Sequence, residues 1–84
     1  MRKFCKNFKG LVVEDNASSI EVARLFLEDY GFQSIKLAYT GKEALRYFSA
    51  DLDLVLLDLN LPDISGLSVC RELRRRLAGK NLPI

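Results

Sequence analysis

Short apolar runs separated by longer amphipathic stretches define the pattern of this chain. Leu11–Val13 and Leu54–Leu57 are uninterrupted apolar runs, which are typical of strands covered on both faces in a parallel sheet. Residues 34–38 alternate instead, with Ile35 and Leu37 on one face and polar side chains on the other. The pattern therefore predicts two interior strands and one half-exposed edge strand.

The first amphipathic stretch predicts a helix that runs to Tyr30. We expect it to begin at a capping box made by Ser18 and Glu21, whose side chains satisfy free backbone N–H groups, and to stop at Gly31. Its expected apolar face consists of Val22, Ala23, Phe26, Leu27 and Tyr30, with Glu21, Arg24 and Glu28 on the opposite side.

Two further helices are expected on the same grounds. Thr40 and Glu43 form a second capping box, which predicts a shorter helix. The third helix is expected to begin near Ser65 and to end at Gly79. The apolar residues are Ala44, Leu45 and Phe48 for the shorter helix and Val69, Cys70, Leu73 and Leu77 for the third.

Strands and helices thus alternate along the chain, and Leu82–Ile84 look like the first residues of a fourth strand. This order predicts an α/β fold with a parallel sheet. The strand at 33–38 is expected on one side of the strand at 10–13, and the strand at 54–57 on the other. With 84 residues, of which 49% are hydrophobic and 29% charged, the chain has room for one small globular domain, which excludes a two-domain organisation.

Charge is distributed unevenly. Residues 1–9 contain four basic residues and no acid, which predicts a basic N-terminal tail ahead of a domain at residues 10–84. That domain carries nine basic and eleven acidic residues, a balance that argues against a site for a nucleic-acid backbone. The third helix does contain a run of basic side chains, which we interpret as a solvated face where Glu72 can pair with Arg76. The run comprises Arg71, Arg74, Arg75 and Arg76.

The longest apolar run has four residues, whereas a membrane helix requires about 20. Glu14 and Asp15 also interrupt the apolar run that follows the basic start, so the start does not fit a signal peptide. We therefore expect a cytoplasmic protein without a membrane segment. Cys5 and Cys70 are too few and too isolated for a disulfide framework or a zinc site. Because histidine is absent, any chemistry must use carboxylates, hydroxyls, lysines or a bound metal.

The acidic residues that follow the predicted strands are the most informative feature. Glu14 and Asp15 follow the first strand directly, and Asp58 follows the third. If these strands are neighbours, the three carboxylates converge at the switch point of the sheet, where ligands bind in such folds. A cluster of like charges is costly unless a cation neutralises it, and oxygen ligands favour Mg²⁺ or Mn²⁺. Beside such an ion Asp58 is the best-placed nucleophile toward phosphorus.

Taken with their spacing, these residues resemble the receiver domains of bacterial two-component response regulators. The resemblance covers residues 10 to 84 and rests on the acidic pair in residues 11–16 and the Asp-x-Asn-x-Pro-x-x-x-Gly loop in residues 53–66. Residues 30–32 and 38–45 also look like the family. The resemblance implies a flavodoxin-like parallel sheet with flanking helices, here incomplete, with three strands and the start of a fourth.

The resemblance also implies a phosphoacceptor signalling domain rather than an enzyme. Asp58 would accept a phosphoryl group from a histidine kinase or phosphotransfer protein. Asp15 and Asp58 would bind Mg²⁺ directly, Glu14 would do so through water, and Asn60 would contribute its backbone carbonyl. Pro62 and Gly66 would shape the loop, because proline restricts φ and glycine permits a tight approach.

The chain departs from the family pattern at its end. It stops at Ile84, where a fourth strand would begin, so the switch hydroxyl and the phosphate-binding lysine of the family are missing. We therefore expect a truncated receiver in which phosphotransfer is slow or absent, and in which the exposed edge of the third strand promotes self-association. The alternative function is an interaction module that self-associates and is not phosphorylated.

A phosphatase of the haloacid-dehalogenase type is a further alternative, because it also uses an aspartate after an apolar strand. Such an enzyme needs a second aspartate two residues after the nucleophile. That position is Asn60 here, which cannot serve as a general acid or base.

Overall fold

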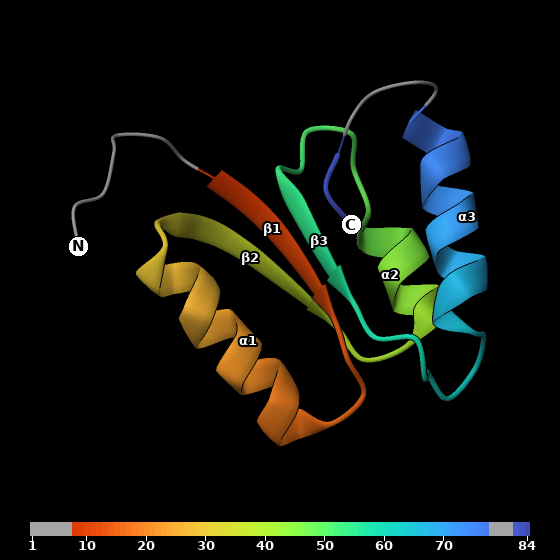
Figure 1. Cartoon of the computed structure of the whole chain (residues 1–84), viewed down its shortest axis with the longest axis horizontal. Coiled ribbons are helices and arrows are strands. Elements are labelled where there is room, and N and C mark those ends of the chain that lie inside the picture. Colours follow the sequence, from red (N-terminus) through yellow and green to blue (C-terminus); the bar gives the residue numbers. More distant parts are fainter. Residues whose placement is uncertain (1–7, 78–81) are drawn as a thin grey trace.

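The computed structural model describes residues 8–77 and 82–84, which form one sheet with helices on both faces (Figure 1). The strands are β1 (Phe8–Val13), β2 (Phe32–Ala38) and β3 (Leu54–Leu57), all parallel and in the order β2-β1-β3. The α/β class and the neighbours of the central strand are therefore as predicted.

The central strand β1 begins earlier than predicted. Phe8 lies opposite Phe32 in the register, and Lys9 lies opposite Ser34 after a local irregularity. The rings of Phe8 and Phe32 pack with their centroids 5.3 Å apart. The assignment of Phe8 and Lys9 to a separate tail is thus wrong, because pairing with β2 draws them into the sheet. The remainder of the proposed tail lies outside the described residues and stays a prediction.

Helix α1 (Ala17–Asp29) begins at a different cap from the one predicted. Its N-cap is Asn16, whose side chain accepts a hydrogen bond of 2.9 Å from the backbone N–H of Ser19. The capping box of Ser18 and Glu21 is therefore wrong, because an amide oxygen available two residues earlier starts the helix there. Glu21 forms an ion pair with Arg24 instead. The predicted stop at Gly31 is confirmed by a φ of 103°, a conformation that favours glycine.

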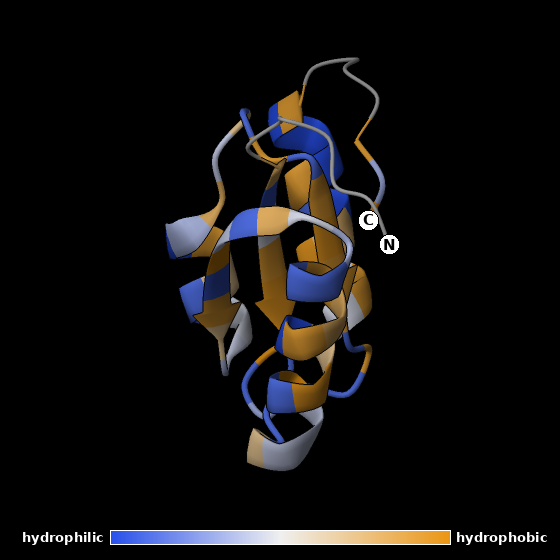
Figure 2. Cartoon of the chain, turned by 90° about the vertical axis from the view of Figure 1, so that its left-hand side faces the viewer, coloured by the Kyte–Doolittle hydropathy of each residue, from blue (hydrophilic) through white to orange (hydrophobic). Residues whose placement is uncertain are grey.

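The predicted apolar face of α1 is only partly buried. Leu27 packs against the sheet, but Val22, Phe26 and Tyr30 are exposed, and Phe26 retains 64% of its accessible surface. Figure 2 shows hydrophobic positions on the outward side of this helix. The physical reason is that α1 lies alone on its face of the sheet in the described part of the chain, so its flanks have no neighbouring helix to pack against.

The two helices on the other face follow the sequence prediction closely. In α2 (Gly41–Tyr47) the Thr40 hydroxyl accepts a 3.0 Å hydrogen bond from the N–H of Glu43, whose carboxylate accepts one of 2.7 Å from the N–H of Tyr39. In α3 (Gly66–Leu77) the apolar stripe faces inward and Glu72 pairs with Arg76 as predicted. The expected end of α3 at Gly79 lies outside the described residues. The stripe comprises the buried Val69, Leu73 and Leu77 and the half-buried Cys70.

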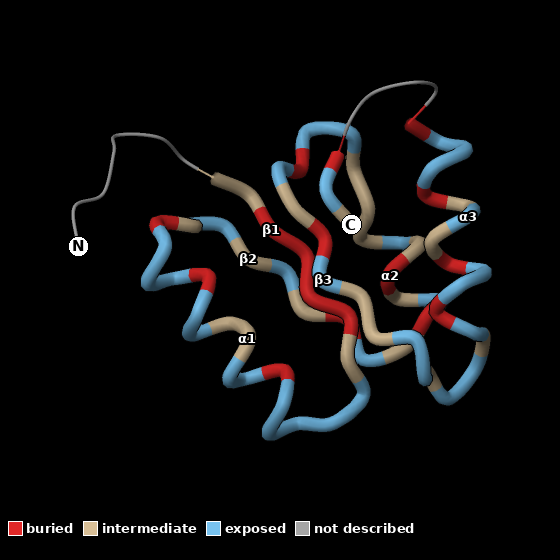
Figure 3. The backbone as a smooth tube through the Cα atoms, viewed as in Figure 1, coloured by how far each residue is buried: buried red, intermediate tan, exposed pale blue. Residues whose placement is uncertain are grey.

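The sheet separates two apolar clusters. One contains Leu11 and Val13 of β1 and packs against α2 and α3, and the other contains Val12 and packs against α1. Figure 3 shows β1 buried along most of its length between the two. A continuous apolar run was predicted for this position, because every side chain of a doubly covered strand meets a packed layer.

The last residues lie beside β3. The N–H of Val55 donates a 3.0 Å hydrogen bond to the carbonyl of Pro83, and Leu82 is buried in the core next to α3. This agrees with the interpretation of Leu82–Ile84 as the start of a fourth strand. None of the helices in the described ranges combines the length and apolar character that a bilayer crossing needs.

Candidate functional site

The carboxyl ends of β1 and β3 lie side by side and carry the acidic residues singled out from the sequence. Glu14 and Asp15 follow β1 directly, and Asp58 follows β3 directly. The N–H of Asp58 donates to the carbonyl of Val13, and the N–H of Glu14 donates to the carbonyl of Ala38, each at 3.0 Å. These bonds extend the strand ladders by one residue, so that the sheet itself holds both acidic positions.

The three carboxylates meet in one cluster. One carboxylate oxygen from each of Glu14, Asp15 and Asp58 lies within 4.8 Å of the others. Glu14 and Asp58 are half-buried and Asp15 is exposed. In the described part of the chain no lysine or arginine nitrogen lies within ion-pairing distance of the three. The cluster therefore carries uncompensated negative charge, which a cation would relieve.

Local hydrogen bonds orient two of these side chains. Asp58 Oδ1 accepts a 3.1 Å hydrogen bond from the N–H of Asn60, and Glu14 Oε2 accepts a weaker one of 3.3 Å from the N–H of Asn16. The first of these bonds fixes the backbone of Asn60 next to Asp58, and the side chain of Asn60 is exposed.

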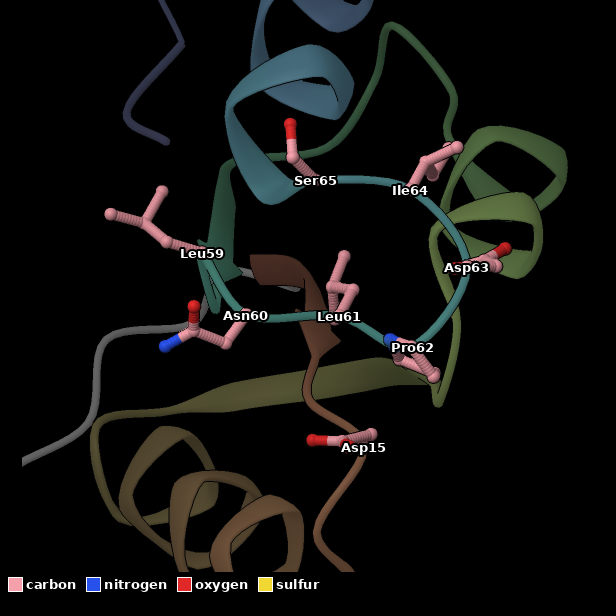
Figure 4. Close-up of a pocket in the computed structure, with 8 residues that line it drawn as sticks. All are labelled: Asp15, Leu59, Asn60, Leu61, Pro62, Asp63, Ile64 and Ser65. Carbon is pink, nitrogen blue, oxygen red and sulfur yellow. The ribbon is translucent and has the colours of Figure 1, made fainter.

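The loop after Asp58 forms one wall of an open pocket of about 380 Å³, and Asp15 lies on the opposite wall (Figure 4). The loop closes tightly, because the N–H of Gly66 donates a 3.0 Å hydrogen bond to the carbonyl of Leu59. Pro62 is exposed at the outer bend of this loop. The residues that line the pocket are Asp15, Leu59, Asn60, Leu61, Pro62, Asp63, Ile64 and Ser65.

The sequence of this chain matches one known protein family over nearly its whole length. Residues 11–84 match the family described as the response regulator receiver domain. The chain belongs to this family. It is therefore a receiver domain, a regulatory signalling domain of two-component systems.

Relatives and solved structures agree with this assignment. The receiver domain is 47% identical over 74 residues to the aerobic respiration control sensor protein ArcB of Escherichia coli, a match that covers 87% of this chain and 9% of ArcB. It resembles the response regulator protein TrrA of Thermotoga maritima in complex with Mg²⁺-BeF, with 40% identity and a TM-score of 0.75, over 82% of this chain and 60% of that one.

A third match is a chain in the structure of histidine kinase ThkA in complex with TrrA. The identity is 37% and the TM-score 0.77, over 89% of this chain and 65% of that one. These likenesses confirm the flavodoxin-like fold, of which the present three-stranded sheet is a part. The receiver domain spans less than two thirds of each of these matched proteins.

The side chains of this receiver domain fit a hard divalent cation. The cluster offers carboxylate oxygens and contains neither sulfur nor imidazole. Mg²⁺ prefers such oxygen ligands and usually keeps several waters, which suits an open, partly exposed cluster. The donor set thus agrees with Mg²⁺ or Mn²⁺ and disagrees with zinc.

One residue of the site was missed by the sequence analysis. Asp63 accepts hydrogen bonds from the backbone N–H groups of Gly41 at 2.8 Å and Lys42 at 3.0 Å. It thereby joins the loop after β3 to the first turn of α2, which lies more than 20 residues earlier in the chain. No local sequence pattern predicts this contact, because an aspartate in a loop and a glycine and a lysine at the start of a helix are each common on their own.

Proposed function

We propose that this receiver domain accepts a phosphoryl group on Asp58 with the help of Mg²⁺ or Mn²⁺. The observation that carries the proposal is the convergence of Glu14, Asp15 and Asp58 within 4.8 Å at the carboxyl edge of the sheet. Three carboxylates so close together, with no basic partner in the described part of the chain, are costly for folding. A function that uses a cation there explains why the sequence carries them.

In this proposal each residue has a distinct role. Asp58 supplies the nucleophilic carboxylate oxygen, and the Asn60 N–H, bonded to Asp58 Oδ1, holds that carboxylate in place. Asp15 and Asp58 would bind the cation directly, Glu14 through water and Asn60 through its backbone carbonyl. When bound, the cation offsets the charge that separates a carboxylate from an incoming phosphoryl group.

The proposed phosphoryl donor is a histidine kinase or a phosphotransfer protein in the cytoplasm. The support comes from similar proteins: one structure holds TrrA in complex with histidine kinase ThkA, and another holds TrrA in complex with Mg²⁺-BeF. ArcB, which is itself named a sensor protein, contains a segment similar to this chain. The receiver domain would act as the acceptor in such an exchange and not as an enzyme with a turnover of its own.

Intact-protein mass spectrometry after incubation with acetyl phosphate and MgCl₂ tests the proposal. During a long incubation, in keeping with the slow phosphotransfer expected from the sequence, the wild-type chain is expected to gain the mass of one phosphoryl group, and Asp58→Asn is expected to gain none. Asp53→Asn serves as the matched control, because Asp53 precedes β3 and lies at the opposite end of that strand. Equal labelling of Asp58→Asn and wild type, or no labelling of the wild type, would reject the role of Asp58.

A second candidate function is an interaction module that self-associates and is not phosphorylated. The observation that favours it is the position of β3 as the outer strand of the described sheet, where Leu56 keeps 37% of its surface exposed. Among the described residues the outer edge of β3 is bonded at Val55, to the carbonyl of Pro83. A strand with a free stretch of edge can pair with another chain. Size-exclusion chromatography with light scattering tests this: a dimer that forms with or without acetyl phosphate supports the module, and a monomer at all concentrations rejects it.

A further inference from the structure

The loop that carries Asn60 is anchored at two places. At its base, the N–H of Gly66 bonds to the carbonyl of Leu59 at 3.0 Å. At its tip, Asp63 accepts the two hydrogen bonds from Gly41 and Lys42 described above, at 2.8 and 3.0 Å. The segment from Leu59 to Pro62, which adjoins the carboxylate cluster, lies between the anchors.

Close packing accompanies the hydrogen bonds at the tip. A Cβ added to Gly41 would lie 2.2 Å from Cγ1 of Ile64 and 3.1 Å from Cγ2 of Val69. Gly41 is buried, so the backbone of α2 and the side chain of Ile64 touch with no space between them. The tip of the loop is therefore held against α2 by both polar and apolar contacts.

Between the two anchors, the half-buried side chain of Leu61 packs against the core cluster on the α2 and α3 face of the sheet. Among the described residues, Leu59–Pro62 form two hydrogen bonds: the base contact at Leu59 and the bond of 3.1 Å from the Asn60 N–H to Asp58. Asn60 and Pro62 are exposed. The orientation of the Asn60 carbonyl thus depends on where the ends of the segment are held, and Asp63 holds the end that is farther from the sheet.

The charge of Asp63 suits this task. Desolvation alone would raise the pKa of its carboxyl, but the hydrogen bonds from the backbone N–H groups of Gly41 and Lys42 keep the pKa below its ordinary value. Asp63 is therefore ionised at neutral pH, and a carboxylate binds two amide donors more strongly than a neutral side chain would.

We infer that Asp63 is a positioning residue for cation binding: by holding the loop tip to the first turn of α2, it sets the place of the Asn60 carbonyl. This inference rests on the proposed function. Residues that orient metal ligands without touching the metal are a general feature of protein metal sites. Here the orienting group lies on the same loop as the ligand, and its partners lie on a helix that contributes no ligand.

A direct effect of the Asp63 charge on the cation is the competing explanation, because Asp63 and Asp15 line the same pocket. The two explanations can be separated at Lys42. Lys42→Pro removes one of the two N–H donors and leaves the Asp63 carboxylate in place. Proline is tolerated in the first turn of a helix, and the preceding Gly41 has no Cβ to clash with its ring. Lys42→Ala keeps the N–H and controls for the lost lysine charge.

The test is the Mg²⁺ affinity of the full chain, measured by NMR titration below the unfolding temperature of every variant. Asp63→Ala is expected to bind Mg²⁺ about tenfold more weakly than wild type, at the lower end of the losses seen when an orienting group is removed. Asp29→Ala, which removes an exposed acid from the end of α1, is expected to bind as wild type does. Lys42→Pro is expected to bind about threefold more weakly than Lys42→Ala, since one of two donors is lost.

Each outcome decides one question. If Asp63→Ala binds as tightly as wild type, the inference is wrong and the proposed function is untouched. If Asp63→Ala binds weakly while Lys42→Pro equals Lys42→Ala, the charge of Asp63 acts directly and the positioning role is rejected. If wild type itself binds no Mg²⁺, the proposed cation site fails, and the inference fails with it.

Discussion

The position that a Cβ of Gly66 would occupy lies 2.2 Å from the backbone carbonyl oxygen of Asp58. The same position lies 2.5 Å from the Cα of Leu59. The first turn of α3 therefore packs directly on the backbone that leaves β3. This contact ties the start of a core helix to the proposed phosphoacceptor.

Gly66→Ala is expected to destabilise the fold by about 3 kcal/mol or more, because the new methyl group meets backbone atoms that cannot rotate away. Gly31→Ala is the matched control: its φ of 103° costs an L residue about 1 kcal/mol, and the nearest atom is 4.0 Å from the added Cβ. Urea unfolding of both variants makes the comparison. An equal loss in the two would mean that α3 can move away from Asp58 at little cost.

Asp15→Asn is expected to stabilise the metal-free chain. It removes one of three carboxylates whose oxygens lie within 4.8 Å of one another, and at this exposed position each relieved repulsion amounts to on the order of 1 kcal/mol. Thermal unfolding in EDTA measures the gain. Added Mg²⁺ is expected to raise the Tm of wild type and to have much less effect on the variant. A variant that is less stable than wild type in EDTA would contradict this account of the cluster.

Leu73→Ala is expected to cost about 3 kcal/mol of unfolding free energy, because a large buried side chain is replaced by a cavity. Leu73 is fully buried between α3 and the sheet. Leu67→Ala, on the same helix but with 53% of its surface exposed, is expected to change stability by about 0.5 kcal/mol or less. Chemical unfolding of the two variants checks the burial pattern of α3, and similar losses would show that the helix is rotated from the orientation described.

The ion pairs of Glu72 predict a pH dependence. Hydrogen bonds from Arg75 and Arg76 lower the pKa of Glu72 to about 2, while the unfolded chain keeps a value of about 4.3. Because the folded pKa is the lower one, the stability from this group is present above about pH 4.3 and is lost as the pH falls toward 2. Glu72→Gln should therefore be less stable than wild type at neutral pH, with a difference that shrinks in acid. Urea unfolding of both proteins at a series of pH values between 7 and about 2 measures this difference. A difference in unfolding free energy that stays constant with pH would refute the role of the Glu72 ion pairs.

Much of the fold could be predicted because it depends on local patterns. The apolar runs of β1 and β3 and the capping pair of Thr40 and Glu43 are read from neighbouring residues, and the structure has strands and a cap there. The interior position predicted for the second run is wrong for the described sheet, because β3 is its outer strand and Leu56 keeps 37% of its surface exposed. The convergence of Glu14, Asp15 and Asp58 followed from the strand order, because the carboxyl ends of parallel neighbours meet at one edge.

The remaining features depend on contacts that no local pattern contains. At the start of α1 both Asn16 and Ser18 are good caps, and the choice of Asn16 reflects where the chain leaves β1. The exposure of Phe26 depends on which elements lie beside α1 and not on the helix itself. Asp63 is a site residue only through partners on α2, so its contribution was invisible until the loop and the helix were seen together.

Glu14, Asp15 and Asp58 are proposed to bind one divalent cation together. Paramagnetic broadening of backbone amide signals by substoichiometric Mn²⁺ tests it most directly, because the effect falls off steeply with distance from the ion. The amides of residues 14–16 and 58–60 are expected to broaden first, and Asp15→Asn is expected to abolish this pattern. Broadening that is absent, or that is centred on the exposed acids Asp51 and Asp53 at the far end of β3, would contradict it.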